Sequence, residues 1–147
     1  MTARSAGFAI RDDRREPAVG EVGRLVLRLF AGLALAFGHG LGKLPPSPRF
    51  VQGVEKMGLP LPEAFSWAAG LSEFAGGLLL AVGLLTRPAS FFILLTMLVA
   101  AVLRHAADPF VAKEKALLFA AVALFFLLAG AGRFSLDAMI RRSRGRR

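Results

Sequence analysis

The sequence contains no cysteine and no tyrosine, and it has one tryptophan and two histidines among 147 residues. The absence of cysteine excludes disulfides, cysteine-ligated zinc, iron–sulfur clusters and thiol-based redox chemistry within this chain. Acidic residues are also scarce, since 10 Asp and Glu stand against 19 Lys and Arg and leave a net charge of +9. With 55% hydrophobic residues, the chain is too apolar for a small soluble domain. The composition therefore predicts an integral membrane protein.

Four apolar stretches dominate the sequence and predict transmembrane helices. They run without the alternation of a half-buried strand, and about 20 apolar residues are enough to cross the hydrocarbon core of a bilayer. The predicted spans are 24–44, 64–85, 89–103 and 116–132. We therefore expect an all-α, integral membrane antiparallel four-helix bundle over residues 24–140. Residues 1–23 form a predicted N-terminal extension, and residues 141–147 form a basic tail.

The connections and their charges predict a topology. The proline-rich loop 45–63 is expected to form a partly helical cap around residues 49–57. With an even number of spans, both termini share one side of the membrane with the turn at Arg87, and that side holds thirteen of the 19 basic residues. Lys and Arg accumulate on cytoplasmic segments, so both termini are predicted to be cytoplasmic. The basic tail is interpreted as an anchor on anionic lipid rather than a nucleic-acid or partner-docking segment.

Glu73 is the only charged residue within the predicted span 64–85. A carboxylate at membrane depth usually faces the bundle interior, is paired, and marks a functional path. The first predicted helix places Arg28, His39 and Lys43 on one face. By depth Glu73 lies between His39 and Arg28, so either can pair with it. Two interpretations stay open: a structural ion pair between two helices, or a site of ligand binding or proton transfer.

A second polar cluster is expected at the outer ends of the helices. Its members are His39, Lys43, Arg104, His105, Asp108, Lys113 and Glu114. A histidine or lysine donor beside an apolar slot suits the carbonyl group of a quinone. Two histidines at similar depth also raise the possibility of haem ligation, but His105 stands at a helix boundary, which disfavours haem. No metal site and no covalent cofactor are predicted.

Several spaced motifs resemble those of the DoxX family of small membrane proteins. They are His39-Gly40-Leu41-Gly42-Lys43-Leu44, Gly58-Leu59-Pro60, Glu73 with Gly76-Gly77-Leu78-Leu79-Leu80, Gly83, Thr86-Arg87, Lys115-Ala116-Leu117-Leu118, and the segment 130–137. The resemblance implies a four-helix bundle in the bacterial inner membrane. It also implies an association with a quinone-linked oxidoreductase system.

Two functions follow as expectations. The first is a membrane subunit that binds a quinone or a lipid headgroup, with Glu73 and His39 nearest the ligand, Lys43 beside them, and Arg28 as counter-charge. Electrons would then come from a partner protein. The alternative is a non-catalytic structural subunit packed against a larger membrane complex or against further copies of itself. Whether the protein is an enzyme is left open by the sequence.

Overall fold

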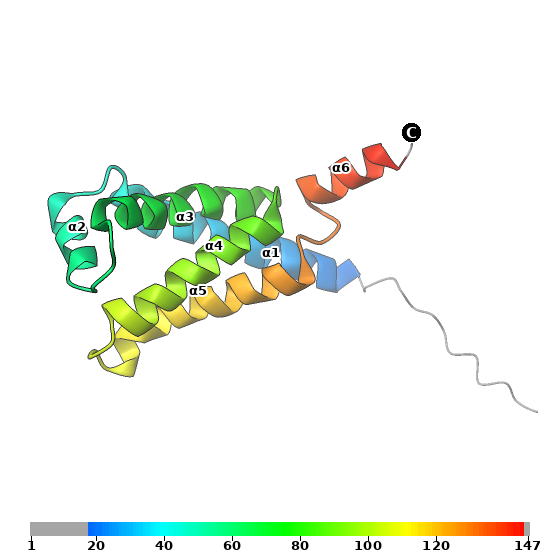
Figure 1. Ribbon diagram of the computed structural model, residues 1–147. Coiled ribbons are helices and arrows are strands. Elements are labelled where there is room, and N and C mark those ends of the chain that lie inside the picture. The colour runs from blue at the N-terminus through cyan, green and yellow to red at the C-terminus, as the bar shows by residue number, and fades with distance from the viewer. Residues whose placement is uncertain (1–17, 146–147) are drawn as a thin grey trace, which may run out of the picture.

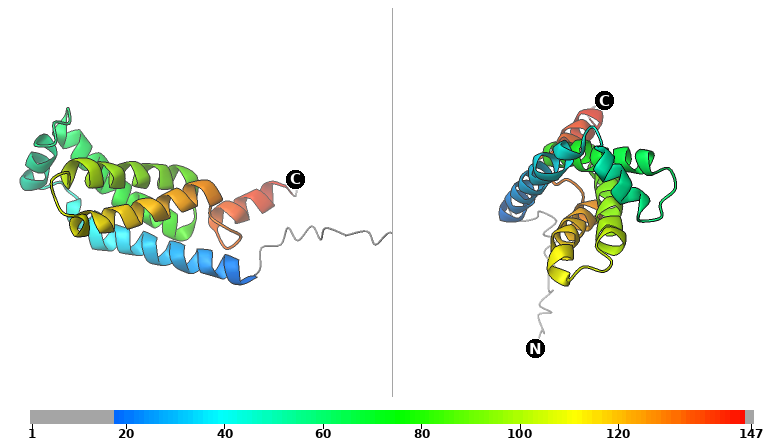
Figure 2. Two further views of the ribbon diagram at one scale, coloured as in Figure 1. Left: turned by 90° about the horizontal axis from the view of Figure 1, so that it is seen from below. Right: turned by 90° about the vertical axis from the view of Figure 1, so that its left-hand side faces the viewer.

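The computed structural model describes residues 18–145 and is all-helical over that range, with no strand (Figure 1). Four long helices lie side by side (Figures 1 and 2): α1 (Ala18–Leu35), α3 (Pro62–Val82), α4 (Thr86–Val99) and α5 (Phe110–Ala129). The short helix α2 (Pro48–Glu55) lies at one end, and α6 (Leu136–Arg144) extends beyond the other. We call the end with α2 and the α4–α5 turn the Lys43 end, and the end with α6 and the α3–α4 turn the Arg28 end.

Two of the long helices continue as π-helical segments at the Lys43 end. Helix α1 passes into a π-helix, Ala36–Gly40, and then a 3-10 turn, Leu41–Lys43. Helix α4 passes into a second π-helix, Ala100–Arg104, where the His105 N–H donates to the Ala100 carbonyl over 3.0 Å. Short π-helical segments are rare and often occur at functional sites. Here one holds His39 and the other is followed directly by His105.

Three helical stretches among residues 18–145 are long and apolar enough to cross a membrane: Ala18–Lys43, Pro62–Val82 and Thr86–Arg104. Helix α5 has 20 residues, but Lys113, Glu114 and Lys115 lie near its start. Helix α1 begins at Ala18, so residues 18–23 of the predicted extension are helical, and residues 1–17 lie outside the described range. Helix α2 confirms the helical segment expected in the first loop.

Glycines bring α1 and α3 into backbone contact. A Cβ atom added at Gly32 would lie 2.5 Å from the Gly77 carbonyl oxygen, and one added at Gly77 would lie 2.7 Å from the Gly32 carbonyl oxygen. A Cβ atom at Gly40 would overlap the backbone of Phe74. Small residues allow such close approach between membrane helices. The contact sets the register that places Lys43 beside Glu73.

Asp137 holds the start of α6 on the α3–α4 turn. Its carboxylate accepts hydrogen bonds from the N–H groups of Leu85 and Thr86, at 2.9 and 3.0 Å. Its own N–H donates to the Gly83 carbonyl over 2.9 Å. Although burial acts to raise it, the pKa of Asp137 lies below its ordinary value because these N–H groups and the charge of Arg141 favour the carboxylate. The carboxylate therefore caps α4 and fixes α6 at the Arg28 end.

Candidate functional site

Glu73 and Lys43 form an ion pair between α3 and the end of the α1 segment. The Lys43 ammonium lies 2.5 and 2.7 Å from the two carboxylate oxygens of Glu73. The Glu73 side chain is 2% exposed, whereas that of Lys43 is 33% exposed and its ammonium lies 5.5 Å from the centre of the Phe50 ring of α2. Glu73 therefore faces the bundle interior, as predicted, with Lys43 reaching inward from the helix end.

The expectation that Arg28 is the counter-charge of Glu73 was wrong. Arg28 is 2% exposed and lies inside α1, on the side of the bundle away from Lys43. Its Nε atom donates to the Ala81 carbonyl over 3.2 Å, and its two terminal nitrogens donate to the carbonyls of Ala131 and Phe134 over 2.5 and 2.7 Å. These three carbonyls belong to α3 and the α5–α6 connection. Arg28 therefore ties α1 to two distant segments of the chain, and Lys43 pairs with Glu73.

A cavity of about 370 Å³ lies next to the Lys43–Glu73 pair. We call it the Glu73 cavity. Its polar lining is His39, Lys43, Glu73, His105 and Lys115, and its apolar lining is Leu35, Met97, Ala100, Val111, Ala112, Ala116 and Phe119. Residues from α1, α3, α4, α5 and both π-helical regions therefore meet around one space. Its volume lies within the range of about 300–1,000 Å³ that is typical of small-molecule sites.

The charge of the Glu73 cavity is not cancelled by the ion pair. Lys43 and Glu73 neutralise each other at hydrogen-bond distance, while Lys115 adds a second ammonium group to the lining. The His39 ring contacts the Phe119 ring edge-on, with 5.6 Å between ring centres. The cavity thus combines hydrogen-bond donors with an apolar wall, an arrangement that suits an amphipathic ligand with an acceptor group on its head.

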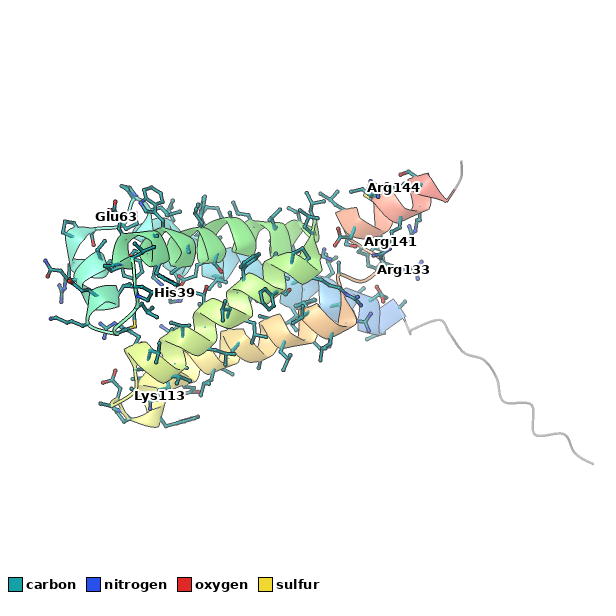
Figure 3. All side chains as sticks on the ribbon, in the orientation of Figure 1. His39, Glu63, Lys113, Arg133, Arg141 and Arg144 are labelled. Carbon is teal, nitrogen blue, oxygen red and sulfur yellow. The ribbon has the colours of Figure 1, made fainter. Side chains whose placement is uncertain are left out.

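The predicted outer cluster is brought together only in part. His105 lines the Glu73 cavity, and its Nδ1 atom lies 2.7 Å from a carboxylate oxygen of Asp108. Lys113 instead donates to the Ala106 carbonyl over 2.8 Å and lies at the α4–α5 turn (Figure 3). Arg104 and Glu114 are exposed and do not line the cavity. Figure 3 also shows His39 lying among the long helices.

Lys115 is the cavity residue that sequence reasoning missed as a site residue. It stands between Glu114 and Ala116 at the start of an apolar run, where a lysine usually extends toward the headgroups. The helical spacing of Lys115, Ala116 and Phe119 was the available signal, since residues three and four apart share a face. Among residues 18–145, no three histidine or acidic side chains gather closely enough to hold a metal ion.

The helices and the site together define an all-helical membrane protein with a small cavity lined by both polar and apolar side chains. The chain matches the DoxX family over residues 23–106, which is more than half of its length, and it belongs to that family. Comparisons with curated proteins and with solved structures found no match.

Proposed function

We propose that this DoxX-family protein binds the headgroup of a quinone in the Glu73 cavity and serves a quinone-linked oxidoreductase system. The observation that carries the proposal is an ion pair with a buried carboxylate, set into the wall of a cavity that has both polar and apolar lining. Uncompensated charge is avoided inside a membrane bundle, and paired charge there commonly marks a ligand or proton path. A lipid headgroup is the competing ligand for the same cavity.

We propose that α5 is the fourth membrane span, which places the Glu73 cavity just inside one face of the bilayer. Lys113, Glu114 and Lys115 lie near the start of α5, where long charged side chains can extend to the headgroup region. With α5 inserted, the Lys43 end lies at one membrane surface and the Arg28 end at the other. We propose that the Arg28 end faces the cytoplasm and that the membrane is a bacterial inner membrane; the excess of Lys and Arg at this end supports the orientation.

Four polar residues of the cavity have a part in this proposal. Lys115 and His39 donate hydrogen bonds to the ring carbonyl groups, and the walls formed by Leu35, Met97 and Phe119 contact the ring. Helices α1 and α5 pack together least closely among neighbouring long helices, so the isoprenoid tail leaves the cavity between them. Glu73 and Lys43 exchange protons with the bound headgroup. Electrons come from a partner oxidoreductase.

The experiment compares quinone content in two alanine variants of α5. Ala116 lines the Glu73 cavity, whereas Ala121 is exposed on the same helix. The Ala116→Phe side chain fills the cavity, and the Ala121→Phe side chain adds equal volume outside it. The variants are purified in nanodiscs with ubiquinone or menaquinone, and bound quinone is extracted and quantified.

The proposal expects saturable quinone in the wild type and in Ala121→Phe, and loss of it in Ala116→Phe. Glu73→Gln is expected to remain folded but to lose quinone turnover with a partner, because an amide cannot exchange a proton. Quinone content that is equal in the two phenylalanine variants would overturn the proposal. The absence of saturable quinone in all of them would favour the structural-subunit alternative.

A further inference from the structure

A second cavity, of about 700 Å³, lies at the Arg28 end of the bundle. We call it the arginine pocket. Its charged lining is Glu21, Arg24, Arg87, Arg133, Arg141 and Arg142. These side chains come from α1, α4, the α5–α6 connection and α6, so four separate segments supply the charges. Figure 3 shows Arg133 and Arg141 together at this end, with Arg144 further along α6.

The arginine pocket carries a large excess of positive charge. Among residues 18–145, Glu21 is the only carboxylate in its lining, and both of its oxygens are engaged: one accepts from the Arg133 N–H at 2.5 Å, the other from Arg24 at 3.2 Å. Arg87 gives one N–H to the Leu128 carbonyl at 3.3 Å. Arg141 and Arg142 make no side-chain hydrogen bond to any of residues 18–145. Several guanidinium donors are therefore available to an anion.

The arginine pocket is held in shape by buried contacts rather than by the arginines that line it. Arg28 donates to the Ala131 and Phe134 carbonyls and so fixes the α5–α6 connection on α1. Asp137 fixes the start of α6 on the α3–α4 turn. The side chain of Glu21 is 7% exposed and holds the backbone at Arg133. When the donors are already held in position, less free energy is lost in ordering the binding site when an anion binds.

Apolar side chains are exposed beside the arginine pocket. Leu128 on α5 is 69% exposed, and Met139 on α6 is 62% exposed. Helices α3 and α4 meet at this end, where each of these membrane-capable helices terminates. Guanidinium groups and exposed apolar side chains of α5 and α6 therefore occur together at this end of the bundle. That combination distinguishes a membrane lipid from a soluble ion.

We propose that the arginine pocket binds the phosphate of an anionic phospholipid headgroup, whose acyl chains lie along the exposed apolar residues of α5 and α6. Guanidinium groups bind phosphate through paired hydrogen bonds, and basic pockets at the ends of membrane helices accept such headgroups. The proposal depends on the membrane placement of the helices and is independent of quinone binding at the opposite end. A soluble phosphate ester has the same chemistry and is distinguished by experiment.

Two neighbouring arginines of α6 supply a matched pair of variants. Arg142 lines the arginine pocket, whereas Arg144 does not, and both are exposed on the same short helix. Arg142→Gln and Arg144→Gln therefore remove equal charge from the same membrane face. The purified full-length protein in neutral detergent is titrated with dioctanoyl phosphatidylglycerol, dioctanoyl phosphatidylcholine and glycerol 3-phosphate. Binding is followed by microscale thermophoresis, and circular dichroism checks the fold of each variant.

Saturable binding of the phosphatidylglycerol is expected, with much weaker binding of the phosphatidylcholine and of glycerol 3-phosphate. Arg142→Gln should weaken it severalfold and Arg87→Gln/Arg142→Gln by about tenfold or more, since charged hydrogen bonds to phosphate are lost, while Arg144→Gln changes it little. Equal weakening by Arg142→Gln and Arg144→Gln would show that the lipid does not bind in the arginine pocket. If glycerol 3-phosphate binds as tightly as the lipid, the bound phosphate does not have to come from a lipid, and that part of the proposal is overturned. If phosphatidylglycerol shows no saturable binding, the whole proposal is overturned.

Discussion

The two partners of the Lys43–Glu73 pair should differ in how much stability their removal costs. The Glu73 side chain is 2% exposed and that of Lys43 is 33% exposed. Lys43→Met leaves a buried carboxylate without its ion-pair partner, and breaking a buried pair in this way typically costs about 3–5 kcal/mol. Glu73→Gln leaves an ammonium group that can turn to water, and its cost should be about 1.5 kcal/mol, near the low end for a charged hydrogen bond.

The double variant Lys43→Met/Glu73→Gln separates the interaction energy of the ion pair from the other contributions of the two side chains to stability. It holds no unpaired buried charge, so it should be more stable than Lys43→Met alone, with a coupling energy of about 2 kcal/mol or more. The assay is reversible unfolding in mixed micelles by titration with sodium dodecyl sulfate, followed by circular dichroism. Equal costs for the two single variants, or costs that add within error in the double variant, would refute the reasoning.

Three further predictions concern the ends of the bundle. Arg28→Lys should lower the free energy of unfolding by about 2–3 kcal/mol in the same assay. One ammonium cannot reproduce the guanidinium's hydrogen bonds to three carbonyls, each worth about 1.5 kcal/mol or more. An effect under about 0.5 kcal/mol would contradict the role of Arg28. Because the folded-state pKa of Asp137 is lowered, its contribution to the free energy of unfolding should be complete above about pH 4. That contribution should be lost as the pH falls through the folded-state pKa. Asp137→Asn should flatten this acid dependence, and an unchanged dependence would count against the cap. Since the chain has no native cysteine, cysteines introduced at Ser47 and Gly145 should react with an impermeant reagent from opposite faces of sealed vesicles. Reaction from one face would contradict the proposed four-span topology.

The long apolar stretches were sufficient to predict the long helices, and the cost of placing a carboxylate in the membrane was sufficient to predict the interior position of Glu73. The partner of Glu73 was missed because depth was counted along helix positions. Lys43 lies beyond the π-helix at Ala36–Gly40, and its long side chain reaches back from the helix end to the carboxylate. The positions of residues along a helix do not show how far a lysine side chain extends from the helix end.

The role of Arg28 could not be predicted from local spacing. Two of the carbonyls that it binds, those of Ala131 and Phe134, lie more than 100 positions away in the sequence. Backbone carbonyls carry no sequence signature, so only the folded chain shows that they converge on one guanidinium. The same holds for the arginine pocket, whose arginines were each interpreted as part of a general positive bias.

Photoaffinity labelling with an azido-quinone tests the central claim, which is that the Glu73 cavity holds a quinone headgroup. The protein is reconstituted in nanodiscs and irradiated with the probe, and labelled peptides are mapped by mass spectrometry. The account predicts labels within residues 35–43, 97–105 and 111–119, which contain all the lining residues of the cavity except Glu73. These labels should be lost when unlabelled quinone is in excess or when Ala116→Phe fills the cavity. Labels confined to other segments, or labels that excess quinone does not displace, would contradict it.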